Sequence, residues 1–584
     1  MKILLRLLFF AGRYWVLLLF AFTCLIGTTA FGMAVPWVIR TAIDTVTGHG
    51  ESSFLFFAAI LIIGASAMRG ISAFGHMYLS EVVSQKTAYD VRNAIYEKLQ
   101  QLSFAYHDKN QTGQLMSRAT VDVEAIRMFF GRGLLHLGQL FFLVTGVATI
   151  LISMNWRLAL ISLAFLPLIG FRAAKVALRL RPIWLHVQQM LGFIGTTLEE
   201  NLTGVRVVKA FCQQGGESQK FNTQAQDLYD SQINAARQMA FNMPLMAFLI
   251  SFPTALILWY GGLQVMEGNL TIGGLTQFML YLGMMVMPVR RLGGFTNMIS
   301  RAIPAGQRIL EILDTRSPVQ EKPNAIELEG FKGRVRFKNV SFSYNSKDAV
   351  LNGVDFRVQP GEVVALVGSL GSGKSTLAHL IPRFYDVDSG SITIDGIDIR
   401  TLKLSALRRD VGIVQQDIFL FSDTIKQNIA YGAVDANIER IVEAAKAAYL
   451  HDFVKSLPDG YDTWVGERGI TLSGGEKQRL AIARTLLTDP AILILDDSTS
   501  NIDPGIEHLI RQALDKLIKG RTSFIITHRL PIIKNADLIL VLHEGLLVEQ
   551  GKHNDLMAGD GLYKEIYESQ ISAAEISDGK AQKE

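Results

Sequence analysis

Val363-Val-Ala-Leu-Val-Gly-Ser-Leu-Gly-Ser-Gly-Lys-Ser-Thr376 is the stretch that decides the fold of the second half of this chain. Its apolar start is typical of a buried strand, and an apolar helix is expected to open at Leu377. Between them lies the pattern G-x-x-x-x-G-K-[ST], whose glycines let backbone N–H groups surround a phosphate. We expect Lys374 to reach the β- and γ-phosphates and Ser375 to bind Mg²⁺. The stretch therefore predicts a nucleoside-triphosphate site.

A second motif follows more than a hundred residues later. Ala491-Ile-Leu-Ile-Leu495 is an apolar strand pattern, and Asp496 and Asp497 come directly after it. A strand that ends in an acid is where an aspartate on the Mg²⁺ side of a phosphate site belongs. We therefore assign Asp496 to the metal side, and Asp497 to the position of the carboxylate that polarises the attacking water.

A third motif suggests a second anion site in the same chain. In Leu472-Ser-Gly-Gly-Glu-Lys-Gln-Arg479, two glycines follow Ser473 and open a helix. Backbone N–H groups at such a helix start favour a bound anion. Because one chain needs only one cradle for its own nucleotide, the second predicts a nucleotide that is held from two sides.

The first half of the chain has the composition of a membrane domain. Hydrophobic residues make up 49% and charged residues only 19% of the whole sequence, whereas soluble domains carry about 25% charged residues. A spanning helix needs about 20 mostly apolar residues. The predicted spans are 14–39, 52–68, 133–156, 158–171, 238–266 and 268–289. The first of these spans is too long for a cleaved signal peptide, so we expect it to remain in the mature protein.

Positive charge near the span ends predicts the orientation. Lys2, Arg6 and Arg13 precede the first span, and Arg290 and Arg291 follow the last. Such residues favour the cytosolic side, so both termini are expected in the cytosol. The long polar stretches 80–127 and 172–237 mix apolar and charged residues at helical spacing, which predicts that the spans continue as helices beyond the membrane.

Charge and cysteine content exclude other classes of protein. The net charge is only +4, from 57 basic and 53 acidic residues, which gives no concentrated basic face for nucleic acid. The only two cysteines, Cys24 and Cys212, are far apart in the sequence, so we expect free thiols and no disulfide scaffold. The segment 316–332 is rich in proline and charge and reads as a linker. It separates a membrane domain, 1–315, from a soluble α/β domain, 333–570, and a polar tail, 571–584, follows.

Together these motifs resemble the ATP-binding-cassette (ABC) exporter family, in its half-transporter form. The resemblance covers nearly the whole chain, and its most specific element is the signature Leu472–Gln478. It implies an all-α membrane domain of six helices, followed by an α/β P-loop ATPase domain with an N-terminal β subdomain and a helical signature subdomain. It implies ATP and Mg²⁺ as ligands, the bacterial inner membrane as location, and hydrophobic or amphipathic small molecules as cargo.

The resemblance also assigns residues. Tyr344 is similar to the aromatic residue that stacks on adenine, and Gln416 to a glutamine that contacts Mg²⁺. Asp503 resembles the acid of a loop that crosses the dimer, and His528 the histidine that contacts the γ-phosphate. The ATP-binding set would be Tyr344, Gly368, Ser369, Gly371, Ser372, Gly373, Lys374, Ser375 and Thr376, with Ser375, Gln416 and Asp496 on the metal and Ser473, Gly474, Gly475 and Glu476 serving a partner chain's site.

Two further segments resemble the family's intracellular loops. The first runs from Phe104 through Gly113 to Asp122, and the second is Gly204–Phe211. The resemblance implies that each carries a short helix that couples the membrane domain to a nucleotide domain.

The chain departs from the family at the residue expected to activate water. The family has glutamate directly after the metal-side aspartate, and this chain has Asp497. The shorter side chain loses about 1.5 Å of reach, and a misplacement near 1 Å can cost about 100-fold in rate. Asn501 and Ile502 also differ from the usual alanine and leucine, and Glu476 stands where glutamine is commoner.

A weak site beside a complete signature favours a heterodimer. This pattern resembles the degenerate-site subunit of heterodimeric bacterial multidrug exporters, in which a partner supplies the catalytic glutamate. Two alternatives stay open: a homodimer in which Asp497 is an adequate base, and a nucleotide-gated channel or regulatory subunit. A soluble cassette protein that acts on nucleic acid is disfavoured by the six predicted spans.

Overall fold

The structure, a computed structural model, describes residues 2–48, 53–290, 292–328, 330–345, 348–466, 469–496, 504–527, 530–569 and 571. The chain forms two compact units. One comprises Met1–Gln101 and Gln111–Thr315, and the other comprises Leu102–Asn110 and Arg316–Glu584. The short segment Leu102–Asn110 thus packs with the second unit although it lies within the sequence of the first.

The described residues of the first unit form helices joined by short turns. Within its described residues, six helical stretches are long and apolar enough to cross a membrane. This confirms the predicted number of spans. The helices are α1 (Lys2–Gly12), α2 (Trp15–Thr47), α3 (Ser53–Gln101), α5 (Thr112–Ser117), α6 (Val123–Met128), α7 (Leu134–Met154), α8 (Trp156–Thr203), α9 (Val205–Ala210), α10 (Gln214–Met266), α11 (Ile272–Arg290) and α12 (Leu292–Asp314).

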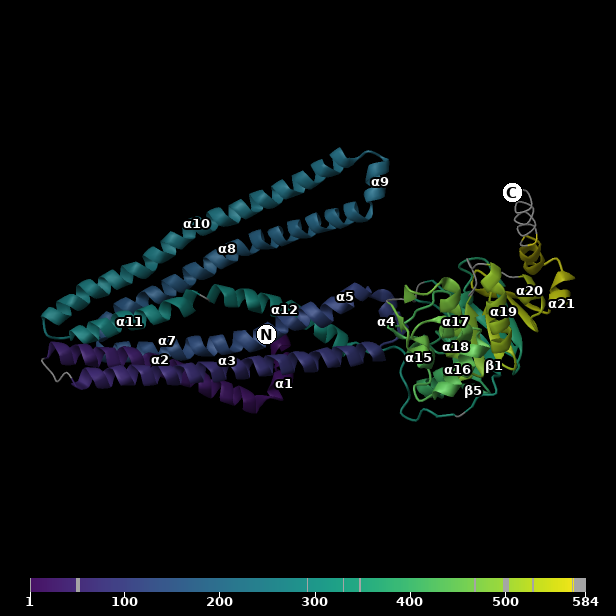
Figure 1. The fold of residues 1–584 in the computed structure, drawn as a ribbon, viewed down its shortest axis with the longest axis horizontal. Helices are drawn as coiled ribbons and strands as arrows, with labels where there is room; N and C mark the ends of the chain where they lie inside the picture. Colours follow the sequence, from purple (N-terminus) through teal and green to yellow (C-terminus); the bar gives the residue numbers. More distant parts are fainter. Residues whose placement is uncertain are drawn as a thin grey trace. The chain divides into compact units, whose positions relative to one another are not determined.

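The long helices confirm that the spans continue as helices into the polar stretches. α3, α8 and α10 have 49, 48 and 53 residues, far more than the roughly 20 that a bilayer requires. α8 begins at Asn155, whose side chain accepts a hydrogen bond from the backbone N–H of Leu158 and caps the helix. α8 and α10 lie side by side over much of their length, joined by the short helix α9 (Figure 1).

One boundary in this unit differs from the prediction, and two further features had no prediction. The last spanning helix begins at Ile272 rather than Gly268, because Gly268 adopts a φ of +78° in the turn after α10. The N-terminal residues form a separate helix, α1. The helical stretch through 112–154 contains two π-helical turns, η1 (Arg118–Asp122) and η2 (Phe129–Gly133).

The second unit contains two larger sheets. The first is antiparallel, with the order β2-β1-β4-β5. The second has the order β12-β11-β3-β10-β9-β6, and all its neighbours are parallel except β11 and β12. The strands are β1 (Val335–Phe342), β2 (Leu351–Val358), β3 (Val363–Gly368), β4 (Ser389–Ile394), β5 (Ile397–Asp398), β6 (Val411–Val414), β9 (Ile492–Asp496), β10 (Thr522–Ile526), β11 (Leu538–His543) and β12 (Leu546–Gly551).

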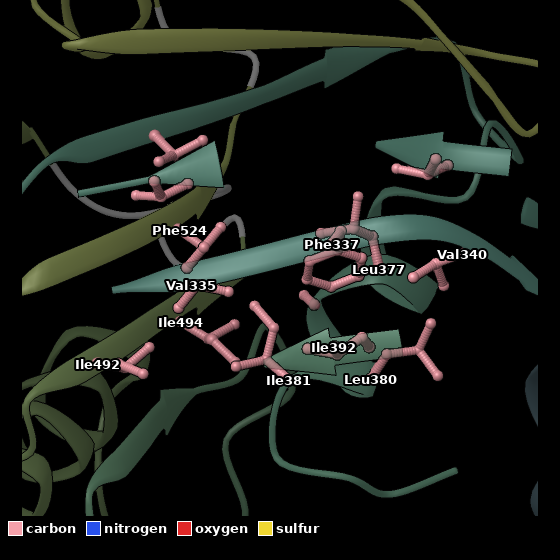
Figure 2. Packing of buried hydrophobic residues seen from close by; sticks show 14 of the residues in the cluster. Val335, Phe337, Val340, Leu377, Leu380, Ile381, Ile392, Ile492, Ile494 and Phe524 are labelled. Atoms are coloured by element: carbon pink, nitrogen blue, oxygen red, sulfur yellow. The ribbon is translucent and has the colours of Figure 1, made fainter. Parts of the chain in front are cut away.

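One apolar core joins the two sheets. Helix α13 (Lys374–Leu380) contributes Leu377 and Leu380, which pack with Phe337 of β1 and Ile494 of β9. Figure 2 shows these side chains meeting between the strands. Because α13 begins at Lys374, this packing also fixes the position of the loop in front of it.

A second core holds the helical part of this unit. It is built from α15 (Ile425–Ala430), α16 (Ile438–Ala447), α17 (His451–Ser456), α18 (Gly474–Thr488) and α19 (Pro504–Ile518). A short ribbon of β7 (Asp423–Thr424) and β8 (Trp464–Val465) accompanies it. Other helices of the unit include α4 (Phe104–Lys109), α14 (Leu404–Arg409), α20 (Leu530–Lys534) and α21 (His553–Met557).

Candidate functional site

The phosphate loop and two of the predicted metal ligands, Gln416 and Asp496, lie at one edge of the larger sheet. Strands β3, β10, β9 and β6 are parallel neighbours, so their carboxyl ends lie at the same edge. Ile526 of β10 is in register with Leu366 of β3 and with Asp496 of β9. Ligands of open α/β sheets bind outside these carboxyl ends. The phosphate loop after β3, Asp496 at the end of β9 and Gln416 just after β6 therefore share this edge.

Lys374 is held inside the phosphate loop. Its Nζ donates hydrogen bonds to the carbonyl oxygens of Gly368, at 2.8 Å, and Ser369, at 2.7 Å. The side chain is only 8% exposed. A phosphate in the loop offers the ammonium group stronger, charged acceptors. The loop is thus built around a cation whose neutral partners are exchangeable for phosphate oxygens.

Burial lowers the pKa of Lys374, and the charge of Asp496 partly opposes this shift. Taking an ammonium group out of water disfavours its charged form. A nearby anion such as Asp496 has the opposite effect. An anionic nucleotide would add to this effect, so the loop gains electrostatic stabilisation when phosphate binds.

Two glycines give the loop its path. Gly373, directly before α13, has a φ of +99°, and a Cβ there would lie 2.7 Å from Leu351 Cδ2. A Cβ on Gly368 would lie 2.1 Å from the carbonyl oxygen of Leu542. Both positions therefore require glycine, for conformation and for space. Because β2 and β11 supply these neighbours, the sheets determine the shape of the loop.

Tyr344, the predicted adenine-stacking residue, lies just after β1. Its hydroxyl is 3.0 Å from Thr376 Oγ1, which ties the ring to the end of the phosphate loop. The ring is 39% exposed, so part of it is accessible for stacking on a base. The edge of Tyr385 meets this ring at a centroid distance of 5.2 Å, a favourable T-shaped aromatic contact.

Helix α4 docks beside this aromatic pair. Asp108 of α4 accepts a hydrogen bond from the Tyr385 hydroxyl, and the ring of Phe104 stacks on Phe384 at 4.1 Å. Burial, and then the bond to Asp108, raise the pKa of Tyr385 far above its usual range, so the phenol stays protonated and donates. One residue thus contacts both α4 and the expected base site.

The signature motif starts α18 with a capping box. The Ser473 hydroxyl accepts from the backbone N–H of Glu476, and the Glu476 carboxylate accepts from the Ser473 N–H at 2.7 Å. This arrangement satisfies two backbone donors at the helix start. The capping box therefore explains structurally why this chain can have Glu476 where glutamine is commoner.

α18 is anchored at its buried side. The guanidinium of Arg479 donates to the carbonyl oxygen of Tyr449 at 2.6 Å, and burial lowers the pKa of Arg479. These buried contacts fix the position of the exposed helix start at Ser473 and Gly474.

Several predicted residues lie outside the described part of the chain. These are Asp497, Asp503 and His528. Of the predicted metal ligands, Ser375 and Gln416 are exposed and Asp496 is partly buried. A hydroxyl, an amide oxygen and a carboxylate at one sheet edge are hard oxygen ligands of the kind that Mg²⁺ prefers. The donors present therefore fit this ion.

Sequence reasoning missed three contributors to the site. Tyr385 and Asp108 carry no motif that would reveal their contact, because they are far apart in the sequence. The capping box did have a signal, since Ser473 followed three residues later by a glutamate is its sequence signature. Glu476 was interpreted only as a departure from a family pattern.

Comparisons with known proteins agree with this geometry. A family model of the ABC transporter transmembrane region matches residues 18–289, and one described as ABC transporter matches 351–500. The chain is 37% identical over 558 residues to an ATP-dependent lipid A-core flippase of Syntrophus aciditrophicus, covering 96% of this chain and 93% of the relative. It is 37% identical over 554 residues to the putative multidrug export ATP-binding/permease protein YgaD of Bacillus subtilis, covering 93% and 96%.

A solved structure extends the likeness to the whole fold. It is a bacterial Atm1-family ABC exporter with ATP bound, 31% identical, with a TM-score of 0.79. The alignment covers 95% of this chain and 98% of the exporter. The chain is thus an integral membrane protein with an ATP-driven cassette, and it belongs to the ABC transporter family as a half-transporter of the exporter type.

Proposed function

We propose that this chain is one subunit of a heterodimeric exporter whose two ATP sites are unequal. The site built on Lys374 and Asp496 binds ATP and hydrolyses it slowly. The other site uses this chain's signature and a catalytic glutamate from the partner. One observation carries the proposal: Asp497 stands where the family has glutamate, while the signature beginning at Ser473 is complete.

In this chain's own site, the residues mainly bind and orient the nucleotide. Tyr344 stacks on the base, and Lys374 exchanges two carbonyl partners for phosphate oxygens. Ser375, Gln416 and Asp496 would hold Mg²⁺, and the bound ion would supply neutralisation of the nucleotide's phosphate charge. His528 would contact the γ-phosphate, and Asp497 would reach the attacking water less well than glutamate because its side chain is one methylene shorter.

In the partner's site, this chain supplies the start of α18. The backbone N–H groups after Ser473 point at the partner's γ-phosphate, and Asp503 lines the loop that crosses between the nucleotide domains. ATP binding closes the two domains, and α4 and α9 transmit the closure to the spans. Alternating access then moves the cargo, and hydrolysis at the partner's site resets the subunits.

The relatives and the composition support the proposed cargo and location. A lipid A-core flippase and a putative multidrug exporter are both relatives, which supports a hydrophobic or amphipathic cargo. We place the protein in a bacterial inner membrane with both termini in the cytosol. The corresponding domains are 1–315, the linker 316–332, the nucleotide-binding domain 333–570 and the tail 571–584.

Substitutions at Asp497 test the unequal sites. In the complex purified from its native membranes, Asp497→Asn should leave ATP turnover within about twofold, because this site contributes little of it. Asp497→Glu should restore the reach of the carboxylate to the attacking water. Both sites would then hydrolyse ATP, so vanadate should trap two nucleotides per dimer instead of one. A working homodimer predicts the opposite for Asp497→Asn, a loss of roughly 100-fold, and that result would reject the proposal.

A further inference from the structure

A charged pocket lies within the membrane unit. Its volume is about 850 Å³, and small-molecule sites span about 300–1,000 Å³. Its walls come from α3, from η1 with α6, and from α12. The lining includes Arg92, Asp122, Glu124, Met128, Met298, Arg301 and Arg308.

The acids of this pocket are already paired. Asp122 accepts from the guanidinium of Arg308, with 2.7 Å between Nε and Oδ2. Glu124 accepts from Arg127, with 2.8 Å between Nε and Oε2. Asp122 is also largely buried. These two carboxylates therefore have their charge balanced by arginines and leave little to neutralise other cations.

Two arginines of the lining remain without an acidic partner among the described residues. Arg92 on α3 and Arg301 on α12 are both exposed, and no described carboxylate forms an ion pair with either of them. A guanidinium is always charged and is suited to hold a carboxylate or phosphate in a two-pronged contact. The pocket thus has a surplus of positive charge at two points.

The same pocket offers apolar surface. Val121 and Met128 are 64% and 41% exposed, and Met298 and Pro304 also line it. Methionine adapts its shape to varied ligands. Val121 belongs to the π-helical turn η1, a distortion that is frequent at functional sites. A ligand that matches both features is an anion with an apolar body.

The position of the pocket indicates the side from which a ligand arrives. Along the continuous helix α3, Arg92 lies 39 residues beyond Ser53, or about 58 Å at 1.5 Å per residue. The hydrocarbon core is only about 30 Å thick. The chain enters the nucleotide-binding unit ten residues after Arg92, so this end of α3 is cytosolic. A water-soluble ligand fits this position, and a lipid in the bilayer does not.

We propose that this pocket is a loading site for an amphipathic organic anion that arrives from the cytosol, with Arg92 and Arg301 holding its acidic group. The proposal rests on the exporter function above and narrows its cargo class. Apolar contacts with Val121 and Met128 hold the body of the ligand.

The test measures binding directly, so that it does not depend on transport. Carboxyfluorescein serves as the anionic probe and ethidium as a cationic control, and fluorescence anisotropy is followed on the full chain in nanodiscs. Arg92→Gln with Arg301→Gln should raise the Kd for carboxyfluorescein at least tenfold and leave that for ethidium unchanged. The lysine pair, Arg92→Lys with Arg301→Lys, should recover part of the affinity. Arg179→Gln with Arg237→Gln, exposed arginines of α8 and α10, removes the same charge elsewhere and should have no effect.

The outcomes separate this proposal from the exporter function. Failure of the wild type to bind carboxyfluorescein, or an unchanged Kd in the glutamine pair, rejects the loading site. An equal loss in the control pair also rejects it, since a general charge effect would then explain the binding. Binding that follows the expected pattern without ATP-dependent uptake of the dye would leave the site standing and reject export of this class of cargo.

Discussion

The two anion cradles of this chain, the phosphate loop before α13 and the signature at the start of α18, are built in opposite ways. The phosphate loop is enclosed by two sheets, it needs glycine at Gly373, and it carries the buried cation Lys374. The signature cradle is exposed, and its own carboxylate, Glu476, already occupies the helix start. A loop that holds a cation has the means to bind phosphate within one chain. A cradle that holds an anion of its own is less suited to bind a phosphate by itself, which agrees with the proposal that it completes a partner chain's site.

The largest effect should follow removal of the cation from the first cradle. Lys374→Ala deletes contacts to two phosphates, and hydrogen bonds to charged groups contribute about 1.5–3 kcal/mol each. We expect the affinity of this chain for ATP to fall by roughly 100-fold or more. Binding of a fluorescent ATP analogue to the full chain measures this. Lys332→Ala, which changes an exposed lysine, is the control and should bind normally.

The same glycine-to-alanine change should have different consequences in the two cradles. At Gly373 an alanine meets Leu351 and adopts a left-handed backbone, which costs about 1–2 kcal/mol for the backbone alone. At Gly474 no atom lies within 4 Å of the added Cβ. Thermal unfolding should therefore show a loss of about 2–4 kcal/mol for Gly373→Ala and almost none for Gly474→Ala. Equal destabilisation would contradict the contrast between the cradles.

A smaller effect is expected where the first cradle meets α4. Tyr385→Phe keeps the ring contact with Tyr344 and removes the hydrogen bond to Asp108. Because a bond to a charged group contributes about 1.5–3 kcal/mol, we expect cargo-stimulated ATP turnover to fall by roughly tenfold while ATP affinity stays near normal. Asp108→Asn retains an acceptor and should lose less. A change in ATP affinity with intact stimulation would show that Tyr385 serves only the base site.

The smallest effect concerns the anion of the second cradle. Glu476→Gln retains an oxygen that accepts from the Ser473 N–H, so the capping box should remain. Loss of the carboxylate at the helix start should lower the free energy of unfolding by about 0.3–1 kcal/mol, because a negative charge there stabilises the helix dipole. The KM for ATP at the partner's site should fall by up to about fivefold, because one negative charge near the γ-phosphate is gone. A raised KM would mean that Glu476 assists the partner's nucleotide.

Local sequence patterns were enough to predict the features that depend on neighbouring residues. The apolar runs predicted the spans, and the glycines around Lys374 predicted the loop between a strand and a helix. Contacts between segments far apart in the sequence could not be predicted from such patterns. The docking of Phe104 and Asp108 on Phe384 and Tyr385 has no local signal. The π-helical turn at 129–133 depends on tertiary packing, since the carbonyl oxygen of Gly131 accepts from Ser80 of α3.

The most direct test of unequal sites is the native mass of the complex purified through this chain from its own membranes. The account predicts two different chains, the second with glutamate directly after its metal-side aspartate. A mass equal to two 64.6 kDa copies of this chain, with ATP turnover intact, would contradict it, because Asp497 would then be a working base in two equivalent sites.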